Sequence, residues 1–198
     1  MEKRNDIKPK VYLFVFDGFS DWEPSYAIAE INNSGKYSIE TFAVTKEPVT
    51  SAGGITVLPG HTIEDECIKQ AVMIILPGGQ AMEEKKCGEV MTLVEYAYKN
   101  KIPIAAICAA TSLLADMGML DDIKHTSNAP FYLTQFSSWY KGENNYAEEK
   151  AVTCNNIITA GGVYPVEFAR EIFKKLSLYN DERLEKWYQL FKNGVWAE

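Results

Sequence analysis

The chain has 198 residues, a length that fits one ordinary domain and allows a large hydrophobic core without a metal or a disulfide. Hydrophobic residues make up 46% of the chain and charged residues 24%, a composition that excludes a disordered protein. The net charge of −7 argues against a broad surface for nucleic acid or for anionic membranes, because both need clustered lysine and arginine.

The first predicted unit is a strand, a helix and a second strand. Residues 11–16 form a continuous apolar run, which is typical of a central parallel strand covered on both faces. A helical pattern follows from residue 22 to about residue 33, and residues 38–44 predict the next strand. Glu23 lies in the first turn of the helix, at the carboxyl end of the first strand. Its carboxylate could serve a site there or simply complement the helix dipole.

A glycine-rich turn follows another buried strand. Residues 50–58 predict a short hairpin, and His61 follows in a surface loop where we expect no chemical role. Residues 71–76 predict a strand that ends at Pro77-Gly78-Gly79. Two glycines at this position let the backbone approach a ligand, and their N–H groups can form an anion-binding nest. The same triplet is also common in ordinary turns. An amphipathic helix is predicted for residues 89–99.

The central motif is a strand, a sharp turn and a helix around Cys108. Residues 102–107 are a strand-length apolar run, and small residues after Cys108 lead into a helical pattern through Met117. In a parallel sheet this thiol lies at the carboxyl end of the strand, where open α/β sheets bind ligands. The helix N-terminus favours a thiolate, and Ala106 and Ala109 keep bulk away from the turn. Cys108 is therefore a candidate nucleophile, although the string alone is equally compatible with a buried structural cysteine.

The remaining ionisable residues give little sign of a metal centre. His125, in the polar segment 124–128, could orient or deprotonate the thiol, or could lie in a loop without a role. The four cysteines have no C-x-x-C spacing and the two histidines no H-E-x-x-H spacing. We therefore expect reduced thiols, no metal site and no cofactor. The first ten residues are charged and no apolar run approaches roughly 20 residues, so we expect a cytoplasmic protein with no membrane partner.

The last third of the chain predicts an aromatic segment, a hairpin and two helices. Residues 131–146 are aromatic and irregular with one lysine, which favours core, pocket wall or subunit interface over a nucleic-acid platform. Residues 151–160 predict a hairpin, and helices are predicted for residues 166–178 and about 181–192. We expect one domain over residues 1–198, with its core over about 11–178.

Taken together, these motifs resemble the ThiJ/PfpI superfamily, also called the DJ-type family. Each motif is common, but their order and spacing over about residues 11–178 are specific. The resemblance implies a flavodoxin-like three-layer α/β/α sandwich with a mainly parallel sheet, and commonly a homodimer. The motifs that carry it are Asp17-Gly18 with Glu23, Leu76-Pro77-Gly78-Gly79, Ala105-Ala106-Ile107-Cys108-Ala109, His125, and Ile157-Ile158-Thr159-Ala160-Gly161-Gly162.

The resemblance also assigns roles to residues of the candidate site. Cys108 is implied as the nucleophile, Glu23 as a carboxylic acid hydrogen-bonded to it, and His125 as a nearby base. The backbone N–H groups of Gly79 and Ala109 are implied as an oxyanion-binding pair, with Gly78 beside them in the substrate-binding turn.

Two features depart from related enzymes. The peptidase-like branch carries a histidine directly after the nucleophile, where this chain has Ala109. Glutamine amidotransferases of related fold use a later His-x-Glu, whereas no histidine follows His125 here. A complete triad is therefore not visible in the sequence.

Three functions remain open at this point. The favoured hypothesis is a cofactor-independent enzyme in which Cys108 adds to a small reactive carbonyl compound, as the glyoxalase- or deglycase-like members imply. The alternative is a PfpI-like cysteine peptidase or amidohydrolase acting on a peptide substrate, against which Ala109 counts. The third is a redox-sensing or chaperone-like stress protein that works through oxidation of Cys108. In each case we expect a homodimer that binds no nucleic acid.

Overall fold

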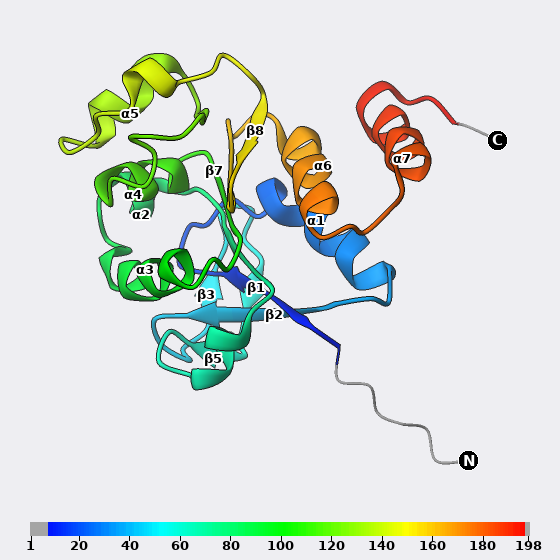
Figure 1. The fold of residues 1–198 in the computed structure, drawn as a ribbon. Coiled ribbons are helices and arrows are strands. Elements are labelled where there is room, and N and C mark those ends of the chain that lie inside the picture. Colours follow the sequence, from blue (N-terminus) through cyan, green and yellow to red (C-terminus); the bar gives the residue numbers. More distant parts are fainter. Residues whose placement is uncertain (1–7, 197–198) are drawn as a thin grey trace.

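A central β-sheet lies between two layers of helices in the computed structural model, which describes residues 8–196 (Figure 1). The strand order is β5-β2-β1-β6-β7-β9-β8, and every neighbouring pair is parallel except β9 and β8. The fold is therefore the mainly parallel flavodoxin-like sandwich that the sequence resemblance implied. The strands are β1 Lys10–Phe14, β2 Ser38–Ala43, β5 His61–Thr62, β6 Met73–Leu76, β7 Ile104–Ile107, β8 Ala151–Cys154 and β9 Ile157–Ala160.

Burial of the strands explains the apolar runs in the sequence. Every residue of β6, β7 and β9 is buried, as expected for strands covered on both faces. The edge strand β8 is only partly buried and pairs with β9 through a tight turn, which confirms the predicted hairpin. The short hairpin predicted for residues 50–58 is also present, as the antiparallel pair β3 Val49–Thr50 and β4 Thr56–Val57.

The helices divide between the two faces of the sheet. α1, α6 and α7 cover one face, and α2, α3, α4 and α5 lie on the other (Figure 1). None of the helices described for residues 8–196 is long and apolar enough to cross a bilayer. The helices are α1 Trp22–Asn33, α2 Gln80–Glu83, α3 Met91–Lys99, α4 Ala110–Asp116, α5 Pro130–Phe136, α6 Pro165–Lys175 and α7 Asp181–Asn193, with 3₁₀ turns η1 Glu66–Gln70, η2 Gly88–Val90 and η3 Glu143–Asn145.

Two expectations from the sequence need correction. The aromatic segment is not irregular throughout, because Pro130 starts the short helix α5, which buries Tyr132 and Leu133. Proline suits this position because the first N–H groups of a helix have no intrahelical acceptor. His61 does not lie in a surface loop. It forms the two-residue strand β5 on the edge of the sheet, and is partly buried there.

The topology brings several loops together at one edge of the sheet. β1 leads to β2 on one side, whereas the chain later returns to place β6 on the other side of β1. Parallel α/β sheets bind ligands at such a switch point, outside the carboxyl ends of the strands. The loops after β6, β7 and β9 meet there and carry Gly78, Cys108 and Gly162, and the first turn of α1, after β1, brings Glu23 to the same place.

Candidate active site

Cys108 occupies a sharp turn between β7 and α4. Its φ is 58°, in the left-handed region that a residue with a side chain rarely adopts. Its N–H donates to the Ala160 carbonyl at 2.9 Å, and its carbonyl accepts from the Thr111 hydroxyl at 2.6 Å. These bonds hold the turn from both sides, so the elbow predicted from the sequence is present. The thiol is only partly buried.

Two glycines form the walls around the thiol. A Cβ atom on Gly78 would lie 2.7 Å from Cβ of Cys108, and one on Gly162 would lie 2.8 Å from its sulfur. Real Cβ atoms do not come this close to their neighbours, so any side chain at either position would displace Cys108. The structure therefore explains Gly162 as a site residue, a role the sequence did not suggest for it.

Glu23 is the acidic partner of the thiol. Its side chain is 1% exposed, and Oε2 accepts a hydrogen bond from the Gly78 N–H at 2.6 Å. Burial raises the pKa of Glu23 to about 7, although hydrogen bonds from Gly78, Cys108 and Ser20 act in the opposite direction. A carboxyl group with this pKa can both accept and donate a proton near neutrality.

The environment disfavours the thiolate that we expected from the helix N-terminus. Burial and the negative charge of Glu23 raise the pKa of Cys108 to about 12, and the Asn128 amide and the Ala109 N–H offset this only in part. α4 has only two turns, and its dipole does not outweigh burial next to a carboxylate. Burial and the neighbouring carboxyl group thus favour the protonated thiol, and Glu23 is the ionisable side chain beside it.

Asn128 is the second side chain at the sulfur, and the sequence prediction missed it. Its Nδ2 lies 3.3 Å from the Cys108 sulfur as a donor, while Oδ1 accepts from the Gly162 N–H at 2.8 Å. The amide therefore links the nucleophile to the glycine wall. The sequence signal for Asn128 was its place in the polar segment 124–128, which also contains His125.

His125 is fully buried, but both of its ring nitrogens are engaged elsewhere. Nδ1 lies 2.7 Å from the Ile123 carbonyl, and Nε2 lies 2.6 Å from the Tyr140 hydroxyl. A carbonyl can only accept, so Nδ1 carries the proton and Nε2 accepts from Tyr140. Burial lowers the pKa of His125 and keeps the ring neutral. The structure gives His125 no hydrogen bond to Cys108, so the base role implied by the resemblance has no geometric support.

The two N–H groups of the glycine turn after β6, those of Gly78 and Gly79, differ in their partners. The Gly78 N–H is bonded to Glu23 and is not free for an oxyanion, whereas the substrate-binding role expected for this turn stays a prediction. The Gly79 N–H has no acceptor among the residues described, and the Ala109 N–H faces the Cys108 sulfur. Unlike the Gly78 N–H, these two N–H groups are not bonded to Glu23. A neighbouring pocket of about 450 Å³ is lined by Asn128, Lys150 and Tyr164, and Cys108 is not among its lining residues.

Comparisons with known proteins agree with this architecture. The model of the DJ-1/PfpI family matches residues 9–175. A solved structure of a ThiJ/PfpI family protein from Bacillus anthracis has a TM-score of 0.88 and 38% sequence identity, and the alignment covers 95% of this chain and 92% of that one.

Two relatives from Bacillus subtilis (strain 168) carry protease names. The protein named uncharacterized protease YoaZ is 40% identical over 191 residues, which cover 92% of this chain and 90% of the relative. The protein named uncharacterized protease YdeA is 29% identical over 188 residues, which cover 94% and 93% of the two chains. By the family match and by this level of identity, the chain belongs to the DJ-1/PfpI family.

Proposed function

We propose that the protein is a cysteine-dependent enzyme that converts a small 2-oxoaldehyde to a 2-hydroxy acid without a cofactor. One observation carries the proposal: a buried carboxyl group with a pKa of about 7, that of Glu23, lies beside the thiol of Cys108. Asn128, the other side chain at the sulfur, cannot accept the thiol proton as a base. Addition of a thiol to an aldehyde needs one group that moves a proton, and Glu23 suffices for it.

The first step joins the thiol to the substrate. The Glu23 carboxylate takes the proton of Cys108 while the sulfur bonds to the aldehyde carbon, and the aldehyde oxygen becomes an oxyanion. The N–H groups of Gly79 and Ala109 would donate to this oxygen. Proton transfer from Glu23 then gives a neutral hemithioacetal and regenerates the carboxylate.

The second stage moves a proton within the substrate. Glu23 removes the hydrogen on the former aldehyde carbon, and the resulting enediol takes a proton at the neighbouring carbon to give a thioester of Cys108. Water then cleaves the thioester and releases the 2-hydroxy acid and the free thiol. The overall change is addition of one water molecule, and the oxidation of one carbon is balanced by reduction of its neighbour.

The glycine walls favour a small substrate. The backbones of Gly78 and Gly162 approach the sulfur so closely that neither position has room for even a methyl group.

A peptidase is the second candidate, because YoaZ and YdeA are named as proteases. Amide cleavage requires protonation of the departing nitrogen, a task that an imidazole beside the nucleophile performs in cysteine peptidases. Here His125 is bonded to Ile123 and Tyr140, and Ala109 follows the nucleophile. We therefore rank amide hydrolysis behind carbonyl chemistry.

The test compares both reactions in the same set of proteins. Wild type, Cys108→Ala, Glu23→Gln and the control Cys154→Ser are incubated with methylglyoxal or with a mixed fluorogenic peptide library. The product is quantified as lactate, because simple loss of methylglyoxal also reports its reaction with surface lysines. We expect lactate from wild type and Cys154→Ser, none from Cys108→Ala, and a rate reduced about 10²- to 10⁴-fold in Glu23→Gln.

Two results would overturn the proposal. Lactate formation that survives Cys108→Ala would exclude this thiol as the nucleophile. Peptide cleavage that depends on Cys108, with no lactate from wild type, would establish the peptidase instead.

A further inference from the structure

A second group of reactive side chains lies at the β5 edge of the sheet, away from Cys108. It contains His61 from β5, Cys67 from η1 and Asp65 between them. One ligand atom from each residue lies within 4.8 Å of the other two. β5 is an edge strand, separated from β7 and Cys108 by β2, β1 and β6. The cluster is thus independent of the candidate active site and of the function proposed for it.

The three donor atoms converge on one point rather than forming a relay. Nδ1 of His61 lies 3.2 Å from Oδ2 of Asp65 and 3.3 Å from the Cys67 sulfur. A catalytic relay would place its acid and its thiol on different ring nitrogens. By contrast, tetrahedral zinc with bonds of about 2.0 to 2.3 Å holds its ligand atoms about 3.4 to 3.6 Å apart. The two distances from Nδ1 need to open by only a few tenths of an ångström, and the carboxylate oxygen and the sulfur also lie within 4.8 Å of each other.

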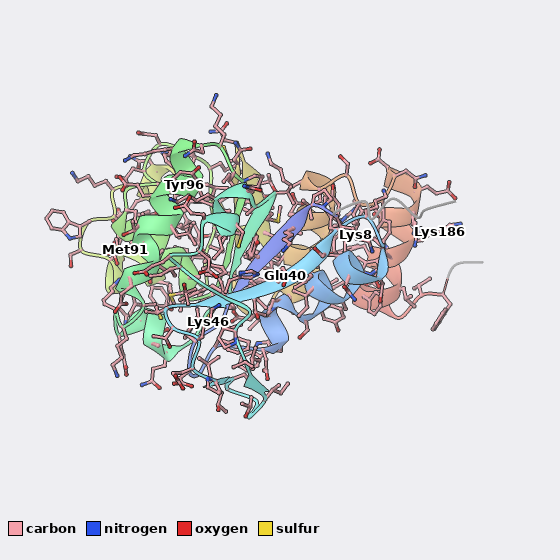
Figure 2. The ribbon with its side chains drawn as sticks, turned by 90° about the horizontal axis from the view of Figure 1, so that it is seen from below. Lys8, Glu40, Lys46, Met91, Tyr96 and Lys186 are labelled. Carbon is pink, nitrogen blue, oxygen red and sulfur yellow. The ribbon has the colours of Figure 1, made fainter. Side chains whose placement is uncertain are left out.

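The opposite nitrogen of His61 faces a carboxylate. Nε2 lies 3.8 Å from Oε2 of Glu40, and Glu40 is itself held by Lys10 at 3.4 Å. Metal-binding histidines characteristically direct their second nitrogen at a carboxylate, which fixes the ring and the tautomer. Glu40 lies on β2 (Figure 2).

Tyr12 supplies a second, independent observation. Its side chain is fully buried, and its ring packs edge-on against His61 with centroids 5.4 Å apart. The hydroxyl faces Cys67 but makes no hydrogen bond of good geometry within the described part of the chain. A buried hydroxyl without a partner is costly. A thiolate at Cys67 would be a strong acceptor for it, and metal binding is what produces a thiolate there.

We propose that Nδ1 of His61, a carboxylate oxygen of Asp65 and the sulfur of Cys67 bind one Zn²⁺ ion, with water as the fourth ligand. A nitrogen, a sulfur and an oxygen donor together suit a borderline-soft ion such as Zn²⁺ better than Mg²⁺ or Ca²⁺. The thiolate and the carboxylate balance its charge, and the thiol proton leaves to solvent.

Nothing in the cluster blocks the ion. The only lysine near Asp65 in the described chain is Lys46, whose amino group is 4.0 Å away and whose side chain is 62% exposed. It can therefore move into solvent when a cation arrives. The sequence contains no paired histidines and therefore predicted no metal site, whereas these ligands have the irregular spacing 61, 65 and 67, and Cys67 is placed by η1.

The experiment is a Co²⁺ titration monitored by absorption. Co²⁺ adopts the same coordination geometry as Zn²⁺ but absorbs visible light, whereas Zn²⁺, a d¹⁰ ion, does not. Cys108→Ala serves as the parent, so that the active-site thiol cannot contribute. We expect one equivalent to bind, with a sulfur-to-cobalt charge-transfer band in the near ultraviolet and visible bands typical of a tetrahedral site. Adding Zn²⁺ should displace the cobalt and raise the unfolding temperature.

Variants of the parent then identify the ligands. Cys67→Ser should remove the charge-transfer band, and Asp65→Asn should weaken binding at least about tenfold. Glu40→Gln, which touches no metal, should weaken it about 10- to 100-fold while keeping the band. Cys154→Ser is the control and should behave like the parent.

Three results would overturn the site: no sulfur band in the parent, a band that persists in Cys67→Ser, or a band lost in Cys154→Ser. Unfolding curves in the absence of metal show whether each variant is folded. If Cys67→Ser is not, His61→Gln decides instead, and cobalt binding of parental affinity in that variant would refute the proposal.

Discussion

Replacing Glu23 with glutamine tests the ionisation of the buried carboxyl group. Glutamine retains an oxygen that can accept from the Gly78 N–H, but it does not titrate. In the wild type, burial raises the pKa of Glu23 from an ordinary 4.5 to about 7. Between these two values the unfolded chain has released the proton while the folded protein still holds it.

The sign and size of the effect follow from this difference. Because the folded state binds more protons in this window, wild-type stability falls as pH rises from about 4.5 to about 7, relative to a protein without the group. At about 1.4 kcal/mol for each tenfold change in proton affinity, the full penalty is about 3 kcal/mol. The free energy of unfolding of Glu23→Gln minus that of wild type should therefore rise by about 3 kcal/mol across the window and stay constant above it.

The assay is urea unfolding of both proteins from about pH 5 to about pH 8 in the presence of a reductant. The exposed Glu47 provides a matched control, because Glu47→Gln makes the same chemical change at a side chain that is not buried. Parallel profiles for wild type and Glu23→Gln would show that Glu23 titrates as in the unfolded chain. Glu23 would then be a much weaker base at neutral pH than the proposed chemistry requires.

Three further substitutions probe the surroundings of the thiol. Gly162→Ala should destabilise the fold by about 1–3 kcal/mol and slow alkylation by iodoacetamide, because its methyl group would overlap the sulfur, whereas Gly88→Ala, with open space at its Cβ, should do neither. Asn128→Asp should place a second negative charge at the sulfur and slow alkylation at least about tenfold, and an unchanged rate would contradict the geometry of the amide. Tyr140→Phe should cost about 1–3 kcal/mol in urea unfolding while alkylation stays at the wild-type rate, and slower alkylation would return the imidazole of His125 to the reaction.

Much of the architecture was predictable because it rests on local rules. Apolar runs without alternation mark strands covered on both faces, and β6 and β7 were found this way. The sharp turn at Cys108 was also predicted, because a strand-length apolar run ends at this cysteine and small residues lead from it into a helical pattern.

The side chains that surround the sulfur depend on contacts that no local rule supplies. His125 and Asn128 are three residues apart in one loop, and their orientations are fixed by Tyr140 on one side and Gly162 on the other. The sequence favoured His125 as the partner of the thiol, because an imidazole can act as a base. In the structure, the Asn128 amide lies within hydrogen-bond distance of the sulfur instead.

Ionisation was the least predictable property of the site. The position of Cys108 before a helix suggested a thiolate, but burial and the neighbouring Glu23 reverse this preference. Burial is a property of the complete fold, and so is the pairing of two groups 85 positions apart. The homodimer implied by the family resemblance likewise stays a prediction.

The close approach of Gly162 to Cys108 has a consequence for when this sulfur is open to oxidation. Gly162 and Asn128 are both synthesised after Cys108. The sulfur of a nascent chain is therefore exposed to solvent before these two residues can pack against it. Once β9 has docked, peroxide reaches the same atom only through the remaining opening. Chemical damage at this position should therefore concentrate in newly made copies, and slow translation of the last third of the gene should increase it.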